Sequence, residues 1–122
     1  MAYRDISVWL EDVLMAVERV FIYTNNIENF SAYTTNFLIR DATERNLEII
    51  AEALKNALKL EPGLPISDTK RIIGLRNIIN HQYYEVEHDR IWVIIKKNMP
   101  VLYTEVKKIL EDYEKRMELN EL

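Results

Sequence analysis

The chain has no cysteine and, among its 122 residues, only two glycines, three prolines and two histidines. The absence of cysteine excludes disulfides and thiolate zinc sites and is typical of a reducing compartment, so we expect a cytoplasmic protein. So few helix breakers favour long helices over many short strands. No apolar run reaches the roughly 18 residues of a membrane span, and residues 1–5 lack the apolar core of a signal peptide. We therefore expect no membrane contact.

The chain also lacks a basic excess, because its 20 acidic residues outnumber its 16 lysines and arginines and give a net charge of −4. A general nucleic-acid binder is usually basic, since phosphate contacts supply most of its non-specific affinity. Any action on nucleic acid must therefore depend on a local basic site. Lys70, Arg71 and Arg76 fall in one short segment. They are candidates for RNA or phosphate contacts, or else solvated charges on a helix.

Apolar residues recur at three- and four-residue steps, which predicts an all-α fold, and the length predicts one domain over residues 1–122. Ser31 or Thr34 should cap the second helix, and Ser67 or Asp68 the third. Pro100 should kink the last helix or start a new one, so we expect an up-and-down bundle of four to five helices. The expected helices cover residues 5–24, 32 or 34 to 60, 68 or 69 to 81–84, and 89 onward, with a loop at 25–31.

The middle of the second predicted helix carries polar residues at helical neighbour spacings, namely Arg40, Asp41, Glu44, Arg45 and Glu48. They could form an exposed face with Arg40–Glu44 and Asp41–Arg45 ion pairs, or a polar seam lining an interface or cleft. Asp41, Glu44 and Glu48 offer oxygen atoms to a cation. They form no clear metal motif, and we expect neither a metal nor a cofactor.

The stretch from Arg76 to Tyr83 carries most of the reactive groups. A fixed cation, an imidazole that titrates near neutral pH and a phenol suit chemistry on a phosphate. In an ideal helix, however, Arg76 and His81 would lie roughly 140° apart around the axis. They would meet only if the helix loosened at its end, or if a second copy of the chain packed alongside. Asn77 and His81 would share a face. The same residues could instead only cap the end of a helix.

Arg76-x4-His81-x-Tyr83, with Asn77 directly after the arginine, resembles the R-x4-6-H signature of the HEPN superfamily. The H-x-Y ending resembles HepT-like toxins, and similarity extends over about 100 residues, including segments 40–42, 47–53, 73–77 and 92–100. The resemblance implies an all-α homodimer with its active cleft at the subunit interface. It also implies metal-independent RNA cleavage in a toxin–antitoxin module. The expected partner is a minimal nucleotidyltransferase antitoxin that silences the toxin by AMPylation of Tyr83.

We therefore hypothesise an endoribonuclease in which the 2′-hydroxyl of RNA attacks the adjacent phosphorus. His81 would be the acid or base, Arg76 would stabilise the developing charge, and Asn77 would orient His81 or bind phosphate. The second proton-transfer group would be His81 of a second copy, because His88 is expected to be a surface or capping histidine in a loop. A non-catalytic helical adaptor that binds the nucleotidyltransferase and a nucleotide is the alternative, as is a purely structural bundle. The sequence leaves open which RNA is cut and whether dimers assemble further.

Overall fold

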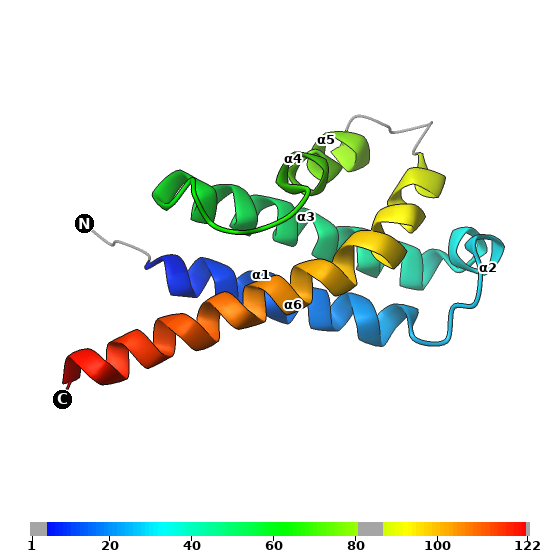
Figure 1. Cartoon of the computed structure of the whole chain (residues 1–122). Coiled ribbons are helices and arrows are strands. Elements are labelled where there is room, and N and C mark those ends of the chain that lie inside the picture. Colours follow the sequence, from blue (N-terminus) through cyan, green and yellow to red (C-terminus); the bar gives the residue numbers. More distant parts are fainter. Residues whose placement is uncertain (1–4, 81–86, 122) are drawn as a thin grey trace.

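A computed structural model describes residues 5–80 and 87–121, and these residues form six α-helices and no strand. The helices are α1 (Ile6–Thr24), α2 (Phe30–Thr35), α3 (Phe37–Leu60), α4 (Thr69–Ile73), α5 (Leu75–Asn80) and α6 (His88–Glu121). The all-α prediction is confirmed. The three long helices α1, α3 and α6 form the body, with α2 at one end and α4 and α5 stacked beside α3 (Figure 1). Within the described ranges, none of the helices has the length and apolar content to cross a bilayer.

The core lies where the apolar faces of the long helices meet. Its fully buried members include Leu10, Val13 and Val17 from α1, Leu47, Ile50 and Leu54 from α3, and Ile91, Met99 and Leu102 from α6. Burying each large aliphatic side chain contributes about 1.5–3 kcal/mol. Ile72 and Leu75 extend this core to the short helices α4 and α5, because both side chains are buried within it. The surface residues that follow Leu75 are therefore anchored to the core.

The second predicted helix is divided into α2 and α3, so its prediction as one helix is wrong. Asn36 lies between them with φ −92° and ψ 87°, and its side-chain oxygen accepts a hydrogen bond from the Ile39 N–H. Asn29 caps α2 in the same way. The predicted caps Ser31 and Thr34 are therefore also wrong. Asparagine ranks among the strongest N-cap residues, so two asparagines create two helix starts where periodicity indicates one.

The third predicted helix is likewise divided, with Gly74 between α4 and α5. Asp68 is the N-cap residue, as predicted, but in a left-handed conformation (φ 56°), and its side chain makes no capping hydrogen bond. It accepts instead from Asn98 of α6 at 2.9 Å. Beside it, the backbone N–H and the hydroxyl of Ser67 both donate to the Glu105 carboxylate. The loop before α4 is thus tied to α6. The predicted helix end at residues 81–84 lies outside the described residues.

Pro100 lies inside α6, which continues from His88 to Glu121, so the predicted new start is wrong. The proline is exposed, and its neighbours Asn98, Met99 and Leu102 are buried. Water can therefore satisfy the carbonyl that loses its donor, while packing of the opposite face holds the helix together. In the first helix, α1 ends at Thr24, as predicted, with Asn25 as its C-cap residue.

Candidate active site

Arg76 lies in the first turn of α5 and reaches across to α3. Its Nη1 atom is 2.5 Å from Oε2 of Glu52, and the two side chains are 49% and 45% exposed. Leu75, the preceding residue, is fully buried and fixes this turn against the core. The guanidinium is therefore anchored at the surface by one carboxylate. Because a guanidinium carries five N–H donors, others remain available to a phosphate.

The surface on the two sides of Arg76 differs in charge. On one side lies a hollow of about 590 Å³, hereafter the Arg76 hollow, whose charged lining residues are Lys55, Lys70, Arg76 and Glu52. On the other side lies a smaller hollow of about 240 Å³, where three carboxylates outnumber two arginines. The three carboxylates come from Asp12, Glu48 and Glu52. An anion would therefore approach Arg76 from the side of Lys55 and Lys70.

Asn77 is exposed and lines the Arg76 hollow together with Arg76 and Lys70. Arg71 lines an adjacent hollow, to which Lys70 also contributes. The structure thus brings Arg76, Asn77 and Lys70 to one site and places Arg71 beside it. His81 and Tyr83, the other residues of the predicted site, lie outside the described residues. Their arrangement relative to Arg76 stays a prediction.

Glu44 is not part of an exposed ion-pair face, because only 7% of its surface is exposed. Its Oε2 atom accepts a hydrogen bond from the Tyr33 hydroxyl at 2.9 Å and lies 2.8 Å from Nδ1 of His88. Arg40 pairs with the neighbouring Asp41 at 3.5 Å and donates to a backbone carbonyl of α2. The interpretation of Glu44 as a surface residue is therefore wrong. Glu44 instead ties α2, α3 and α6 together.

His88 also differs from its prediction, since it is the first residue of α6 and four fifths of its side chain is buried. The reason is the buried carboxylate of Glu44, 44 residues earlier, which offers the imidazole a partner inside the fold. The Glu44 carboxylate also affects the pKa of Tyr33. Burial, reinforced by the negative charge of Glu44, raises the pKa of the Tyr33 phenol well above its usual range.

Sequence reasoning missed Glu52 as the partner of Arg76. The two residues are 24 positions apart and in different helices, so no local spacing signals the contact. It also gave no role to Arg90, which lines the same hollow as Arg71. Asp41, Glu44 and Glu48, weighed as cation ligands, do not form a metal-binding group, and the described parts of the chain hold no other cluster of that kind. Glu44 is held by Tyr33 and His88 instead.

The structure is that of an all-α domain in which an arginine and an asparagine line a basic hollow, a combination chemically suited to an anionic group. A family model described as "Ribonuclease HepT-like" matches residues 13–109. The chain belongs to this HepT-like ribonuclease family.

Three relatives with ribonuclease names are similar to most of the chain. "Putative RNase MJ1380" of Methanocaldococcus jannaschii is 34% identical over 110 residues, which are 87% of this chain and 97% of the relative. "Putative RNase MJ1216" of the same organism is 32% identical over 93% of this chain and 94% of the relative. "Probable ribonuclease HepT" of Thermococcus cleftensis is 30% identical over 83% of this chain and 92% of the relative. No solved structure gives a significant match.

Proposed function

We propose that the protein is an endoribonuclease that cleaves RNA without a metal. The observation that carries the proposal is the position of Arg76 and Asn77 on the rim of a basic hollow in an otherwise acidic protein. Membership of the HepT-like ribonuclease family supports it. RNA is the expected substrate because its phosphates suit the local cations and its 2′-hydroxyl supplies an internal nucleophile.

The reaction proceeds by proton transfer. A base removes the 2′-hydroxyl proton, the oxygen bonds to the adjacent phosphorus, and the bond from phosphorus to the 5′-oxygen breaks as an acid protonates that oxygen. The products are a 2′,3′-cyclic phosphate and a 5′-hydroxyl. His81 acts as acid or base because imidazole titrates near neutral pH. Arg76 binds the non-bridging oxygens as their charge grows, and Asn77 orients His81 or donates to the phosphate.

The active form is a homodimer with the site at the interface. The reaction needs two proton transfers, and the motif of one chain supplies one histidine. His88 is a poor second group because its Nδ1 atom is engaged by the buried Glu44. A second copy of His81, brought in by two-fold symmetry, supplies the missing group.

The protein acts as the toxin of a toxin–antitoxin module, and a minimal nucleotidyltransferase silences it by transferring AMP to Tyr83. The adenylate phosphodiester adds a negative charge that repels an incoming RNA phosphate and competes for Arg76. Tyr83→Phe should therefore stay toxic when the nucleotidyltransferase is co-expressed, since it keeps the ring and loses only the acceptor oxygen. Growth and the intact mass of the protein measure the effect. Full silencing of Tyr83→Phe would reject this switch.

The nuclease proposal is tested by incubating the purified protein with RNA in EDTA and identifying the product ends. Cyclic phosphate and 5′-hydroxyl ends are expected. Arg76→Ala and His81→Ala should each lower the rate by at least about a hundredfold, the contribution typical of a charge-stabilising or proton-transfer group.

The control is Arg19→Ala, which removes an exposed arginine of α1 far along the chain from the motif. Its rate should match that of the wild type, and circular dichroism should show equal helix content in all variants. Undiminished cleavage by His81→Ala would contradict the catalytic assignment. Binding of a nucleotide and of the nucleotidyltransferase without any cleavage would favour the non-catalytic adaptor.

A further inference from the structure

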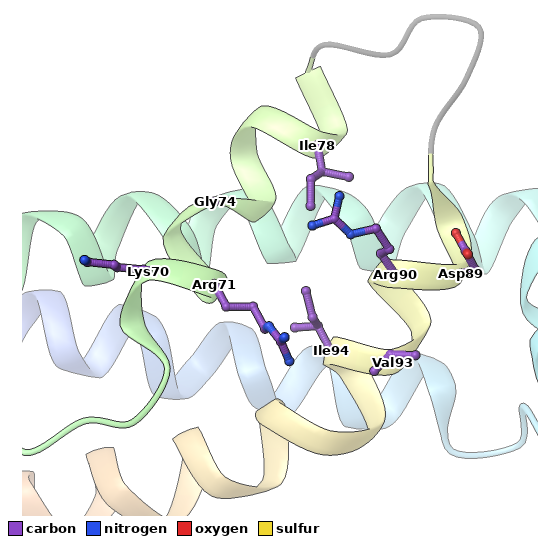
Figure 2. Close-up of a pocket in the computed structure, with 8 residues that line it drawn as sticks. All are labelled: Lys70, Arg71, Gly74, Ile78, Asp89, Arg90, Val93 and Ile94. Carbon is purple, nitrogen blue, oxygen red and sulfur yellow. The ribbon is translucent and has the colours of Figure 1, made fainter.

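The hollow that Arg71 lines has a volume of about 540 Å³ and lies between α4, α5 and the first turns of α6; it is hereafter the Arg90 hollow. Arg71 extends from α4 and Arg90 from α6 toward the same space, whereas Lys70 extends away from it (Figure 2). Ile78, Val93 and Ile94 supply an apolar part of the lining. Two guanidinium groups beside aliphatic side chains suit a ligand with one anionic group and one flat apolar face.

Among the described residues that line this hollow, positive charges outnumber negative ones although the whole protein is acidic. These residues include Lys70, Arg71 and Arg90 and one carboxylate, that of Asp89. Within the described ranges Arg71 forms no ion pair, whereas Arg90 pairs with Glu87 through an exposed contact of 2.6 Å. A solvent-exposed pair of this kind contributes less than about 1 kcal/mol, so a phosphate can compete for the guanidinium.

The Arg90 hollow adjoins the Arg76 hollow. Lys70 and Gly74 line both of them and form their common wall. A nucleic-acid strand, which carries a phosphate at every nucleotide, can therefore extend from Arg76 and Asn77 across this wall into the Arg90 hollow. Lys70 offers a positive charge on this wall. A single nucleotide could fill one hollow, but a strand uses both and the wall between them.

We infer that the Arg90 hollow binds one nucleotide of the RNA strand next to the nucleotide at Arg76. Arg71 and Arg90 hold its phosphate, and its base lies against Ile78, Val93 and Ile94. This inference rests on the proposed ribonuclease function. It adds to the site a subsite that lies outside the R-x4-H-x-Y motif. It also implies that the substrate is single-stranded RNA, because a base in a duplex could not turn its face toward these aliphatic side chains.

The test measures binding separately from cleavage. A short single-stranded oligonucleotide with 2′-O-methyl groups lacks the nucleophile, so it stays intact on the native protein. The double variant Arg71→Gln, Arg90→Gln should weaken its binding about tenfold or more at an ionic strength of about 0.1 M, where distant exposed charges are largely screened. The slope of log K against log salt should fall by about 0.7 for each lost phosphate contact. Fluorescence anisotropy over a salt series gives both quantities.

A matched control removes the same net charge elsewhere. Arg19→Gln, Arg116→Gln replaces two exposed arginines that line neither hollow. Its affinity should change less than about twofold, since separated exposed charges are largely screened. Equal weakening in both double variants would show a general charge effect and overturn the inference, as would no weakening in either.

The apolar part of the hollow is tested by a second pair of variants on α6. Val93→Ser should weaken oligonucleotide binding by about the same factor at every salt concentration, because base contact with an apolar side chain involves no counterion. The control is Val101→Ser, since the two valines are 43% and 47% exposed and only Val93 lines the hollow. Unchanged binding by Val93→Ser would refute the base contact.

A further measurement uses AMP alone as the ligand. Tighter binding of AMP than of the oligonucleotide, lost in Arg71→Gln, Arg90→Gln, would mean that the hollow takes a free nucleotide and would overturn the RNA subsite. Failure of the proposed function gives a different result. Binding of the oligonucleotide would then still depend on Arg71 and Arg90, while the wild-type protein would leave unmodified RNA uncut.

Discussion

Tyr33 links its own protonation to the stability of the fold. The side chain has no exposed surface, and its hydroxyl donates a hydrogen bond to Glu44. In the unfolded chain the phenol ionises near pH 10.0, and in the folded protein its pKa is raised. Its contribution to stability is therefore complete below about pH 10 and declines as the pH rises above this value. Between the two pKa values the decline is about 1.4 kcal/mol per pH unit.

Tyr33→Phe should remove this alkaline decline. At neutral pH the variant should lose about 1 kcal/mol of unfolding free energy, because Glu44 loses one of its donors. Above pH 10 its stability should fall less steeply than that of the wild type. Urea denaturation at a series of pH values measures both effects. Tyr103→Phe, at a half-buried position, is the control. An equally steep decline of stability above pH 10 in Tyr33→Phe and in the wild type would contradict the assignment of this decline to Tyr33.

At the residue scale, the sequence predicts reactive residues from a local pattern but does not predict their partners on distant helices. Arg76 and Asn77 were found from one short segment, and the structure places both on one hollow. Glu52 and Glu44 were not assigned to Arg76 and His88, because those contacts join helices far apart in the chain. A local spacing can propose a reactive residue, but only the fold decides which carboxylate faces it.

At the scale of the helix, periodicity located every long element, since α1, α3 and α6 cover most of the predicted ranges. It failed at Asn36 and Gly74, where the chain turns without losing its apolar pattern. At both positions the interruption is a single residue, which is too short to disturb the spacing of buried side chains on either side. Pro100 gave the opposite error, because tertiary packing retained a helix that the local sequence disfavours.

Pro100→Ala should stabilise α6. Alanine restores a backbone N–H inside the helix and removes a steric clash worth about 3 kcal/mol, offset by about 1 kcal/mol from the freer unfolded chain. We expect a gain of about 2 kcal/mol in unfolding free energy, measured by urea denaturation. Val101→Ala, the next exposed residue, is the control and should change stability by less than about 0.5 kcal/mol. A loss of stability in Pro100→Ala would show that α6 needs its proline.

At the scale of the whole molecule, the proposed dimer makes a prediction that a single-chain site does not. If cleavage uses His81 of both chains at a shared site, a dimer of one wild-type chain and one His81→Ala chain lacks one of the two proton-transfer groups. Random pairing of the two proteins in equal amounts should then leave about one quarter of wild-type cleavage, whereas sites confined to single chains would leave about one half. The measurement is RNA cleavage after the two proteins are unfolded and refolded together.

The controls are the two proteins refolded separately and then combined, and a wild-type sample carried through the same procedure. The separately refolded mixture should keep about one half of wild-type cleavage, because its dimers are not mixed. Cleavage near one half in a co-refolded mixture whose mixed dimers have formed, as checked by native mass, would contradict a site shared between subunits.

The charge contrast around Arg76 has a consequence for the path of a bound strand. A flexible polyanion laid over α5 is attracted by Lys55 and Lys70 and repelled by Asp12 and Glu48. Among the described residues, the charges therefore favour one of the two sides of the arginine. Because every nucleotide carries the same charge, this field sets the route of a strand and leaves its 5′-to-3′ orientation to contacts with sugar and base.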